Sequence, residues 1–191
     1  MVRVLPEAQS KGDVSVEEAI SKRRSVRSFS GEALSEEALA QILWAAQGVT
    51  SRGEGFRVVP SAGATYPLEC YVATHEGVFH YLPKRGGVQE HVQGDRRALL
   101  AQAALGQSFV ADASAVIVLA AVAERTTRRY GNRGNMYIFM EAGHAAQNVH
   151  LQAVALGLGS VPVGAFDDEA VARAIGLPGG QTPLYLIPVG K

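Results

Sequence analysis

One long segment, NMYIFMEAGHAAQNVHLQAVALGLG, constrains the fold of this chain more than any other part of its 191 residues. The segment is rich in helix-forming residues, is apolar almost all round, and has a good helix stop in Gly157. A helix that is apolar on nearly every side has to be buried, either in a core or in a subunit interface. We therefore expect a helix over about residues 135–156 at the centre of the fold or of a dimer.

Four shorter helices are predicted from residues that cap helix ends. Ser15 with Glu18 forms a capping box, and acidic residues that follow Ser35 favour the positive end of a helix. Asp95 and Asp167 are further candidate N-caps. The four expected helices span about residues 15–22, 35–48, 95–106 and 167–176.

The strand pattern mixes a hairpin with separated strands. LECYVAT and GVFHYL are joined by the short turn HEG, which predicts a hairpin. SAVIVLAAV is apolar on both faces and predicts a central buried strand, while PLYLIPVGK predicts a terminal one. This order predicts an α+β fold, a sheet flanked by helices, with residues 1–14 as an N-terminal extension and residues 15–191 as a single domain.

Composition excludes several classes of protein. Basic and acidic residues both number 18, which argues against a nucleic-acid partner. Cys70 is the single cysteine, so neither an internal disulfide nor a cysteine-rich zinc site can form. The longest apolar run, residues 113–123, is shorter than the ~18 residues that span a bilayer, and no signal peptide is evident. We expect a cytoplasmic protein with no membrane partner.

Two stretches could bind a ligand. SKRRSVRSFS places Arg23, Arg24 and Arg27 within five residues, and guanidinium groups suit phosphate; the alternative is an ordinary solvated helix end. We call residues 23–27 the arginine segment. PSAGATYP, residues 60–67, combines small residues that let a planar ligand approach the backbone; taken alone, the stretch favours an ordinary loop. We call it the elbow.

Two further stretches carry weaker signals. His144, Gln147 and Asn148 share a helical face, but a metal site needs more ligands, so we expect no metal and interpret them as satisfied core or interface groups. GLGSVPVGAF follows a helix instead of preceding one, which excludes a dinucleotide-binding fingerprint. Its backbone N–H groups at residues 163–165 could still donate to a ligand.

Four stretches in this order resemble the nitroreductase family of FMN enzymes. They are RRSVRSFS, PSAGATYPLECYV, EAGHAAQNVHLQAVALGLGSVPVGAF and LYLIPVG, and together they cover the chain from about residue 16 to its end. The elbow is most similar to that of the SagB-type dehydrogenase branch. The resemblance implies a nitroreductase-like α+β fold with a central mixed or antiparallel sheet, and an interlocked homodimer with FMN at the subunit interface.

The resemblance also implies roles for single residues. The arginine segment would hold the phosphate, ribityl chain and pyrimidine edge, and the elbow would form a wall against the partner subunit's flavin. The backbone of residues 162–165 would lie near the flavin N5, and Gln107 near the pyrimidine ring. The cofactor-binding residues so implied are Arg23, Arg24, Ser25, Arg27, Pro60, Ser61, Ala62, Gly63, Thr65, Gln107, Pro162, Val163, Gly164, Ala165 and Lys191.

The resemblance implies a reaction that needs no side-chain nucleophile. NAD(P)H would reduce the flavin, and a small electron-poor molecule would reoxidise it at N5 in a ping-pong cycle. From their position, Arg129, Tyr130, Arg133 and Tyr137 are expected on the substrate side. Two alternatives stay open: a SagB-type dehydrogenase or oxidase acting on an azoline-like heterocycle, and an FMN-binding protein without turnover.

Overall fold

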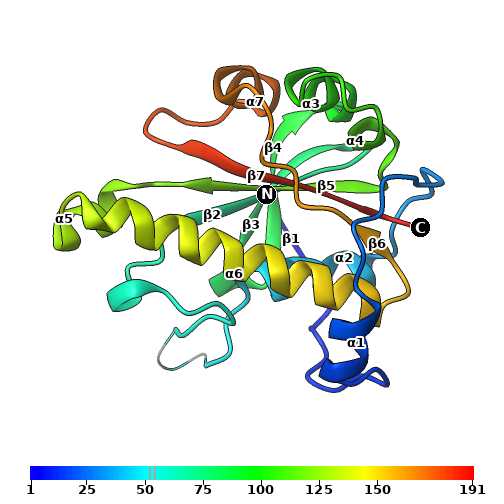
Figure 1. Cartoon of the computed structure of the whole chain (residues 1–191), viewed down its shortest axis with the longest axis horizontal. Coiled ribbons are helices and arrows are strands. Elements are labelled where there is room, and N and C mark those ends of the chain that lie inside the picture. Colours follow the sequence, from blue (N-terminus) through cyan, green and yellow to red (C-terminus); the bar gives the residue numbers. More distant parts are fainter. Residues whose placement is uncertain (52, 54) are drawn as a thin grey trace.

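The computed structural model describes residues 1–51, 53 and 55–191 and shows a seven-stranded sheet with helices on both faces (Figure 1). The strands lie in the order β1–β4–β3–β2–β5–β7–β6, and neighbours pair antiparallel. The strands are β1 (Val2–Val4), β2 (Leu68–Ala73), β3 (Gly77–Leu82), β4 (Gly87–Gln93), β5 (Ala115–Ala121), β6 (Gly159–Ser160) and β7 (Thr182–Gly190). The expected α+β class and the expected hairpin are confirmed.

The helices cover the sheet in two layers. In Figure 1, α6 runs across one side of the sheet with α1 and α2 beside it, and α3, α4 and α7 lie on the other side. The α-helices are α1 (Val16–Lys22), α2 (Glu36–Gln47), α3 (Arg97–Ala103), α4 (Phe109–Asp112), α5 (Glu124–Tyr130), α6 (Arg133–Ala155) and α7 (Asp168–Ile175), and the 3-10 turns are η1 (Ala62–Ala64) and η2 (Pro83–Arg85). No helix in the described ranges has the length and apolar character needed to cross a bilayer.

Strand β5 explains why an uninterrupted apolar run is needed at the centre. All seven of its residues are buried, and their side chains alternate between the two faces. Ile117 and Leu119 join the apolar cluster under α2 and α6, whereas Val116 and Val118 join the cluster under α3 and α7. A strand between two helical layers has no solvent-facing side, so its residues are hydrophobic throughout.

The capped helices begin close to where the sequence predicts, with one exception. Ser15, Ser35 and Asp167 each accept a hydrogen bond from a backbone N–H in the first helical turn. The helix expected over residues 95–106 is shorter, since α3 runs from Arg97 to Ala103. At its start, Asp95 Oδ1 accepts from the backbone N–H of the first helical residue at 2.9 Å, and the same carboxylate also pairs with a charged side chain.

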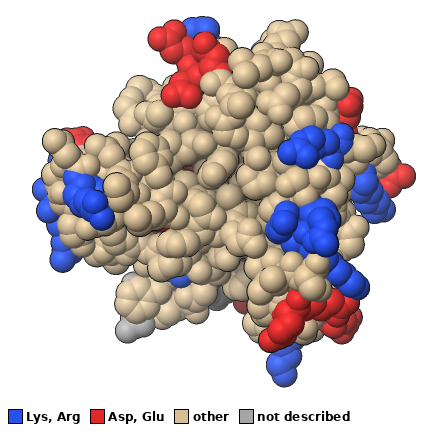
Figure 2. Space-filling model, viewed as in Figure 1, with Lys and Arg blue, Asp and Glu red and all other residues tan. Residues whose placement is uncertain are grey.

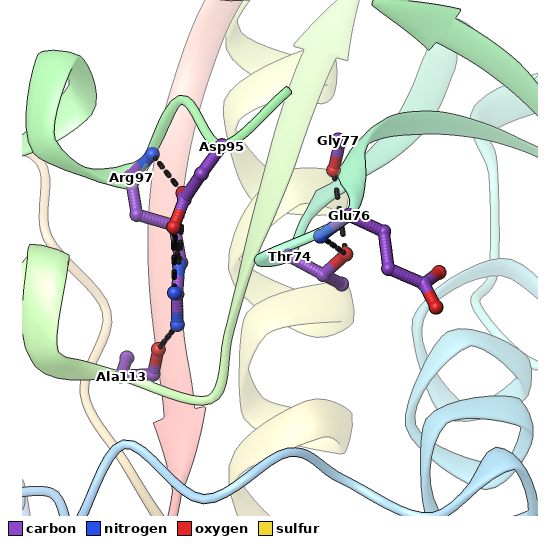
Figure 3. A network of polar contacts seen from close by, with 6 residues as sticks. All are labelled: Thr74, Glu76, Gly77, Asp95, Arg97 and Ala113. Atoms are coloured by element: carbon purple, nitrogen blue, oxygen red, sulfur yellow. Dashed lines mark hydrogen bonds and ion pairs between the residues drawn. The ribbon is translucent and has the colours of Figure 1, made fainter. Parts of the chain in front are cut away.

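That charged side chain is Arg97, which ties α3 to the chain before β5 (Figure 3). Its Nη2 lies 2.7 Å from Asp95 Oδ2, and its Nη1 donates to the Ala113 carbonyl at 2.6 Å. In the hairpin turn nearby, Thr74 Oγ1 accepts from the Glu76 N–H at 3.2 Å. Polar side chains thus fix the connections on this side of the sheet.

The first residues of the chain take part in the sheet. Val2–Val4 form β1, which pairs with β4 in the register Val2 to Gln89. The sequence places these residues in an extension outside the domain, and it predicts no strand there. The pairing covers the outer edge of β4, which would otherwise expose unpaired backbone groups.

Candidate functional site

The residues expected to bind a ligand fall into two groups that lie apart. One group surrounds the arginine segment beside the C-terminal half of α6, and the other surrounds the elbow near α5 and the N-terminal half of α6 (Figure 1). Arg23 contacts α6 at His150, whereas Gly63 of the elbow packs against Tyr130 at the end of α5. Residues 141 and 150 of α6, one beside each group, are separated by roughly 13 Å along the helix axis. We call these two groups of candidate residues the two half-sites.

The arginine segment is held in place by backbone contacts with β6 and β7. Ser25 forms a parallel bridge with Ser160, and the Val26 N–H donates to the Ser160 carbonyl at 3.0 Å. A Cβ atom on Gly159 would lie 2.7 Å from Val26 Cγ1, so this close approach requires glycine. Further along, the Ser30 N–H donates to the Lys191 carbonyl at 2.7 Å.

The positive charges of the arginine segment have no acidic partner. Within the described residues, no Asp or Glu oxygen forms a salt bridge with Arg23, Arg24 or Arg27. The Arg24 guanidinium donates to nearby carbonyls, and that of Arg27 lies 6.0 Å from the centre of the Phe109 ring. Lys191 differs, because its Nζ lies 3.3 Å from Glu32 Oε2. Three uncompensated guanidinium groups favour an anionic ligand.

The loop over residues 162–165 lies next to Gln107. The Gln107 side-chain amide donates to the Ala104 and Ala165 carbonyls at 2.9 and 3.2 Å. Val163 pairs its backbone with Leu186 in both directions. Gly164 and Ala165 are exposed, and their N–H groups donate to no acceptor in the described part of the chain. Free, fixed backbone donors of this kind suit the polar edge of a planar ligand.

The elbow has an unusual backbone. Gly63, Ala64 and Tyr66 all have positive φ, at 59°, 54° and 45°. For the two residues with side chains this costs roughly 1 kcal/mol or more each. Ser61 compensates in part, since its Oγ accepts from the Tyr66 N–H at 2.9 Å. Strained backbone that is retained in this way is typical of functional segments.

Helix α5 anchors the elbow, and the sequence does not predict this contact. Thr126 Oγ1 lies 2.7 Å from Thr65 Oγ1, and Arg125 donates to the Tyr66 carbonyl at 3.1 Å. Arg125 also pairs with Glu69 of β2 at 2.5 Å. In the sequence, Glu69 is the residue that could have indicated such a contact, because a carboxylate in an otherwise apolar strand requires a nearby cation.

The expected substrate-side residues gather at this second half-site. The rings of Tyr130 and Tyr137 meet edge to face, with centroids 5.2 Å apart. The Arg133 guanidinium lies 5.7 Å from the centre of the Tyr137 ring, and Arg129 donates to the Gly63 carbonyl at 3.4 Å. A Cβ on Gly63 would lie 2.6 Å from the Tyr130 hydroxyl. The elbow and the aromatic pair therefore form one surface.

A buried carboxyl group lies on α6 behind the elbow. Glu141 is 3% exposed, and its Oε1 has no hydrogen-bond partner in the described part of the protein. Burial raises the pKa of Glu141 to about 7, while Ser61 and the charge of Arg57 act in the opposite direction. Sequence patterns place Glu141 in a helix but do not identify it as buried with one oxygen lacking a hydrogen-bond partner.

The polar residues expected in the core are on the outside of α6. His144 and Gln147 are exposed and Asn148 is half-buried, so the interpretation of them as core groups is wrong for a single chain. They share the outer face with Met136, which is 44% exposed, and with Phe139 and Met140, which are 63% and 50% exposed. Among described residues, no group of three His, Cys, Asp or Glu could hold a metal ion.

The outer face of α6 is almost free of charge. After Arg133, the buried Glu141 is the one Asp, Glu, Lys or Arg residue in the helix. Figure 2 shows basic side chains over the α5 end and beside α1, with a largely uncharged surface over α6 between them. A contiguous exposed surface of this size, rich in apolar side chains, indicates an interaction site.

Comparison with known proteins identifies related chains. The model of the nitroreductase family matches residues 20–191. A protein of Methanocaldococcus jannaschii, MJ1384, which carries the name of a nitroreductase, is 46% identical over 185 residues, covering 94% of this chain and 92% of that protein.

Solved structures agree with this likeness. A crystal structure from Ralstonia eutropha JMP134, described by the same enzyme name, superposes with a TM-score of 0.90 at 26% identity over 100% of this chain and 89% of that one. A chain of the Escherichia coli microcin synthetase complex McbBCD has the same fold, with a TM-score of 0.79 at 24% identity over 100% of this chain and 77% of that one.

Proposed function

The chain belongs to the nitroreductase family and is an FMN-dependent oxidoreductase, and on this premise we propose that it transfers hydride from NADH or NADPH to a small electron-poor acceptor. FMN combines a phosphate dianion with a planar ring whose edge carries donors and acceptors. The observation that best supports the proposal is the arginine segment, whose three guanidinium groups have no acidic partner among the described residues. Arg27 lies 6.0 Å from the ring of Phe109, two residues after Gln107, and Gln107 donates to the loop that carries the free backbone donors. The residues present therefore fit the cofactor.

Each residue of this half-site would meet a different part of the cofactor. Arg23 would bind the phosphate, Arg24 and Ser25 the ribityl chain, and Arg27 with Gln107 the pyrimidine edge. The backbone of residues 162–165 would orient the ring, with the Gly164 and Ala165 N–H groups near its reactive nitrogen. When bound, FMN supplies the hydride chemistry itself, accepting from the nicotinamide and donating to the second substrate.

We propose that the elbow completes this site from a second copy of the chain. The elbow and the arginine segment lie apart within one chain, which supports a cofactor that contacts one group from each of two subunits. The outer face of α6 is suited to that interface, and a groove of about 1050 Å³ continues it with Trp44, Leu151 and Leu156 among its lining residues. In the resulting homodimer, Tyr130, Arg133 and Tyr137 would border the substrate space above the partner's flavin.

We place the reaction in the cytoplasm, where reduced nicotinamide is supplied. The lone Cys70 is compatible with a reducing compartment, and burial raises the pKa of its thiol to about 12, which makes it unreactive. The half-buried tyrosine and exposed arginine side chains around the elbow favour a small, planar acceptor that stacks on aromatic rings.

A visible spectrum recorded under anaerobic conditions tests this function. We expect the purified protein to be yellow, or to become so with added FMN, and to bleach when NADH or NADPH is added. A colourless protein that cannot be loaded contradicts the proposal. A loaded protein that neither nicotinamide reduces contradicts the proposed donor, and favours instead a SagB-type dehydrogenase acting on an azoline-like heterocycle or an FMN-binding protein without turnover.

Replacing Arg27 by Ala should weaken FMN binding at least about 10-fold, because a charged donor to the pyrimidine edge is lost. The reduction potential of the bound FMN should also fall, since a positive charge that favours the reduced form is removed. Fluorescence titration and a spectroelectrochemical measurement check the two effects. Arg85→Ala, which removes an exposed arginine from η2, is the matched control. Equal affinities for FMN in the two variants would count against the role of Arg27.

A further inference from the structure

A buried histidine and serine lie directly beneath the first residue of the arginine segment. His150, near the C-terminal end of α6, is 3% exposed, and Ser160 of β6 is 2% exposed. His150 Nδ1 lies 2.6 Å from Ser160 Oγ, and its Nε2 lies 3.3 Å from Arg23 Nη1. Three elements, the end of α1, α6 and β6, thus meet in a short chain of polar contacts.

The hydrogen-bond donors in this series of contacts determine which nitrogen of His150 carries the proton. A guanidinium group can only donate, so Nε2 must accept from Arg23 and must itself be unprotonated. The proton of the neutral imidazole is then on Nδ1, which donates to Ser160 Oγ. Burial, followed by the positive charge of Arg23, lowers the pKa of His150 and keeps the ring neutral.

A neutral acceptor orients an arginine side chain, whereas a carboxylate both orients it and compensates its charge. Arg97 and Arg128 are each paired with an acidic side chain, Asp95 and Glu124, which compensates their charge. His150 fixes the direction of the Arg23 guanidinium without compensating it. The full positive charge of a half-buried group therefore stays available to an anion outside the protein.

We propose that His150 is a positioning residue, which acts through Arg23 to hold its guanidinium toward the phosphate of the flavin. Ser160 serves the same purpose one step further back, because it selects the imidazole tautomer that can accept from Arg23. The inference rests on the proposed function, since it takes the anion to be the phosphate of FMN. It assigns α6 a part in cofactor affinity that is exerted through Arg23.

Titration of the full-length protein, freed of flavin, with FMN and with riboflavin tests the proposal. Riboflavin lacks the phosphate, so a residue that acts through Arg23 should affect FMN alone. We expect His150→Leu to weaken FMN binding about 10-fold and to leave riboflavin binding unchanged. His150→Gln should retain affinity within about 3-fold, because its amide can accept from Arg23 and donate to Ser160. His75→Leu, at an exposed histidine in the β2–β3 turn, is the matched control.

The same substitution in an Arg23→Leu background separates positioning from general damage. There, His150→Leu should cause no further loss of FMN affinity, because the residue through which it acts is absent. Equal weakening of FMN and riboflavin, or an undiminished effect in the Arg23→Leu background, would overturn the proposal. If Arg23→Leu weakens FMN binding and His150→Leu does not, the positioning role alone is wrong. A wild-type protein that binds no FMN would contradict the proposed function itself.

The tautomer can be measured without any flavin. Nitrogen chemical shifts of the His150 ring in the flavin-free protein should show a proton on Nδ1 and a bare Nε2 near neutral pH. A ring protonated on Nε2, or on both nitrogens at pH 7, would be incompatible with acceptance from Arg23 and would overturn the proposal even if His150→Leu weakened binding.

Discussion

Phe139→Asp is expected to convert the protein from a dimer to a monomer and to remove most of its capacity to retain FMN. Phe139 is the most exposed aromatic residue on the outer face of α6, and a twofold interface would bury two of the new carboxylates without a partner. We expect the dimer to weaken at least about 100-fold, and the FMN content to fall with it because the elbow no longer reaches the arginine segment. Light scattering and the absorbance of bound flavin measure the two effects.

Leu99→Asp provides the matched control for this result. Leu99 is an exposed apolar residue on α3, which covers the opposite side of the sheet from α6. It should leave both the dimer and the flavin content unchanged. A Phe139→Asp protein that stays dimeric at micromolar concentration would show that subunits do not associate through this face. A monomeric variant that keeps its flavin would contradict the shared site.

Glu141→Gln should stabilise the protein at alkaline pH and have little effect at acidic pH. The folded state holds the Glu141 proton up to a pKa of about 7, whereas an unfolded Glu releases it near 4.5. Between these values the folded state binds more protons than the unfolded state, so Glu141 makes the free energy of unfolding fall as pH rises. The penalty reaches about 3 kcal/mol above pH 7, and an uncharged amide removes it.

Denaturant unfolding at pH 5 and pH 8 tests this expectation. The difference between Glu141→Gln and wild type should be below about 1 kcal/mol at pH 5 and about 3 kcal/mol at pH 8. Glu124→Gln is the control, since Glu124 is exposed and forms an i,i+4 pair with Arg128. A gain that does not depend on pH would mean that the amide improves packing, and that the carboxyl is not protonated at neutral pH.

Local signals predict much of this fold. Side-chain caps at Ser15, Ser35 and Asp167 fix helix starts because the interaction lies within four residues of sequence. The hairpin and the doubly buried β5 are also determined by local pattern. Asp95 shows the limit of such reasoning, since its carboxylate pairs with the Arg97 side chain and α3 stays short.

Elements that depend on distant partners are not predictable in this way. β1 is three residues long and exists because β4, more than 80 residues later, offers an open edge. Helix α5 has charged residues on several sides, and its place is set by contacts with the elbow and Glu69. Neither carries a periodic apolar pattern strong enough to identify it from sequence.

The candidate site shows the same division. Its residues are predicted by motif, and the structure adds that they lie in two separate groups. His150 and Glu141 have no motif that marks them, because their properties arise from burial and from contacts outside their own helix. Arg23, Ser61 and Arg57 are distant in sequence, and Ser160 follows His150 by ten residues. A buried polar residue in an apolar helix is the signal that could direct attention to both.

The separation of the elbow from the arginine segment has a consequence at the level of mass action. If one cofactor contacts two chains, cofactor binding and subunit association are linked equilibria. Cofactor binding then raises the affinity between the subunits, and subunit association raises the affinity for the cofactor by the same factor. Dilution of the protein would then release its flavin, and scarcity of flavin would loosen the assembly. The supply of one vitamin-derived molecule and the copy number of one polypeptide would jointly set how much enzyme a cell possesses.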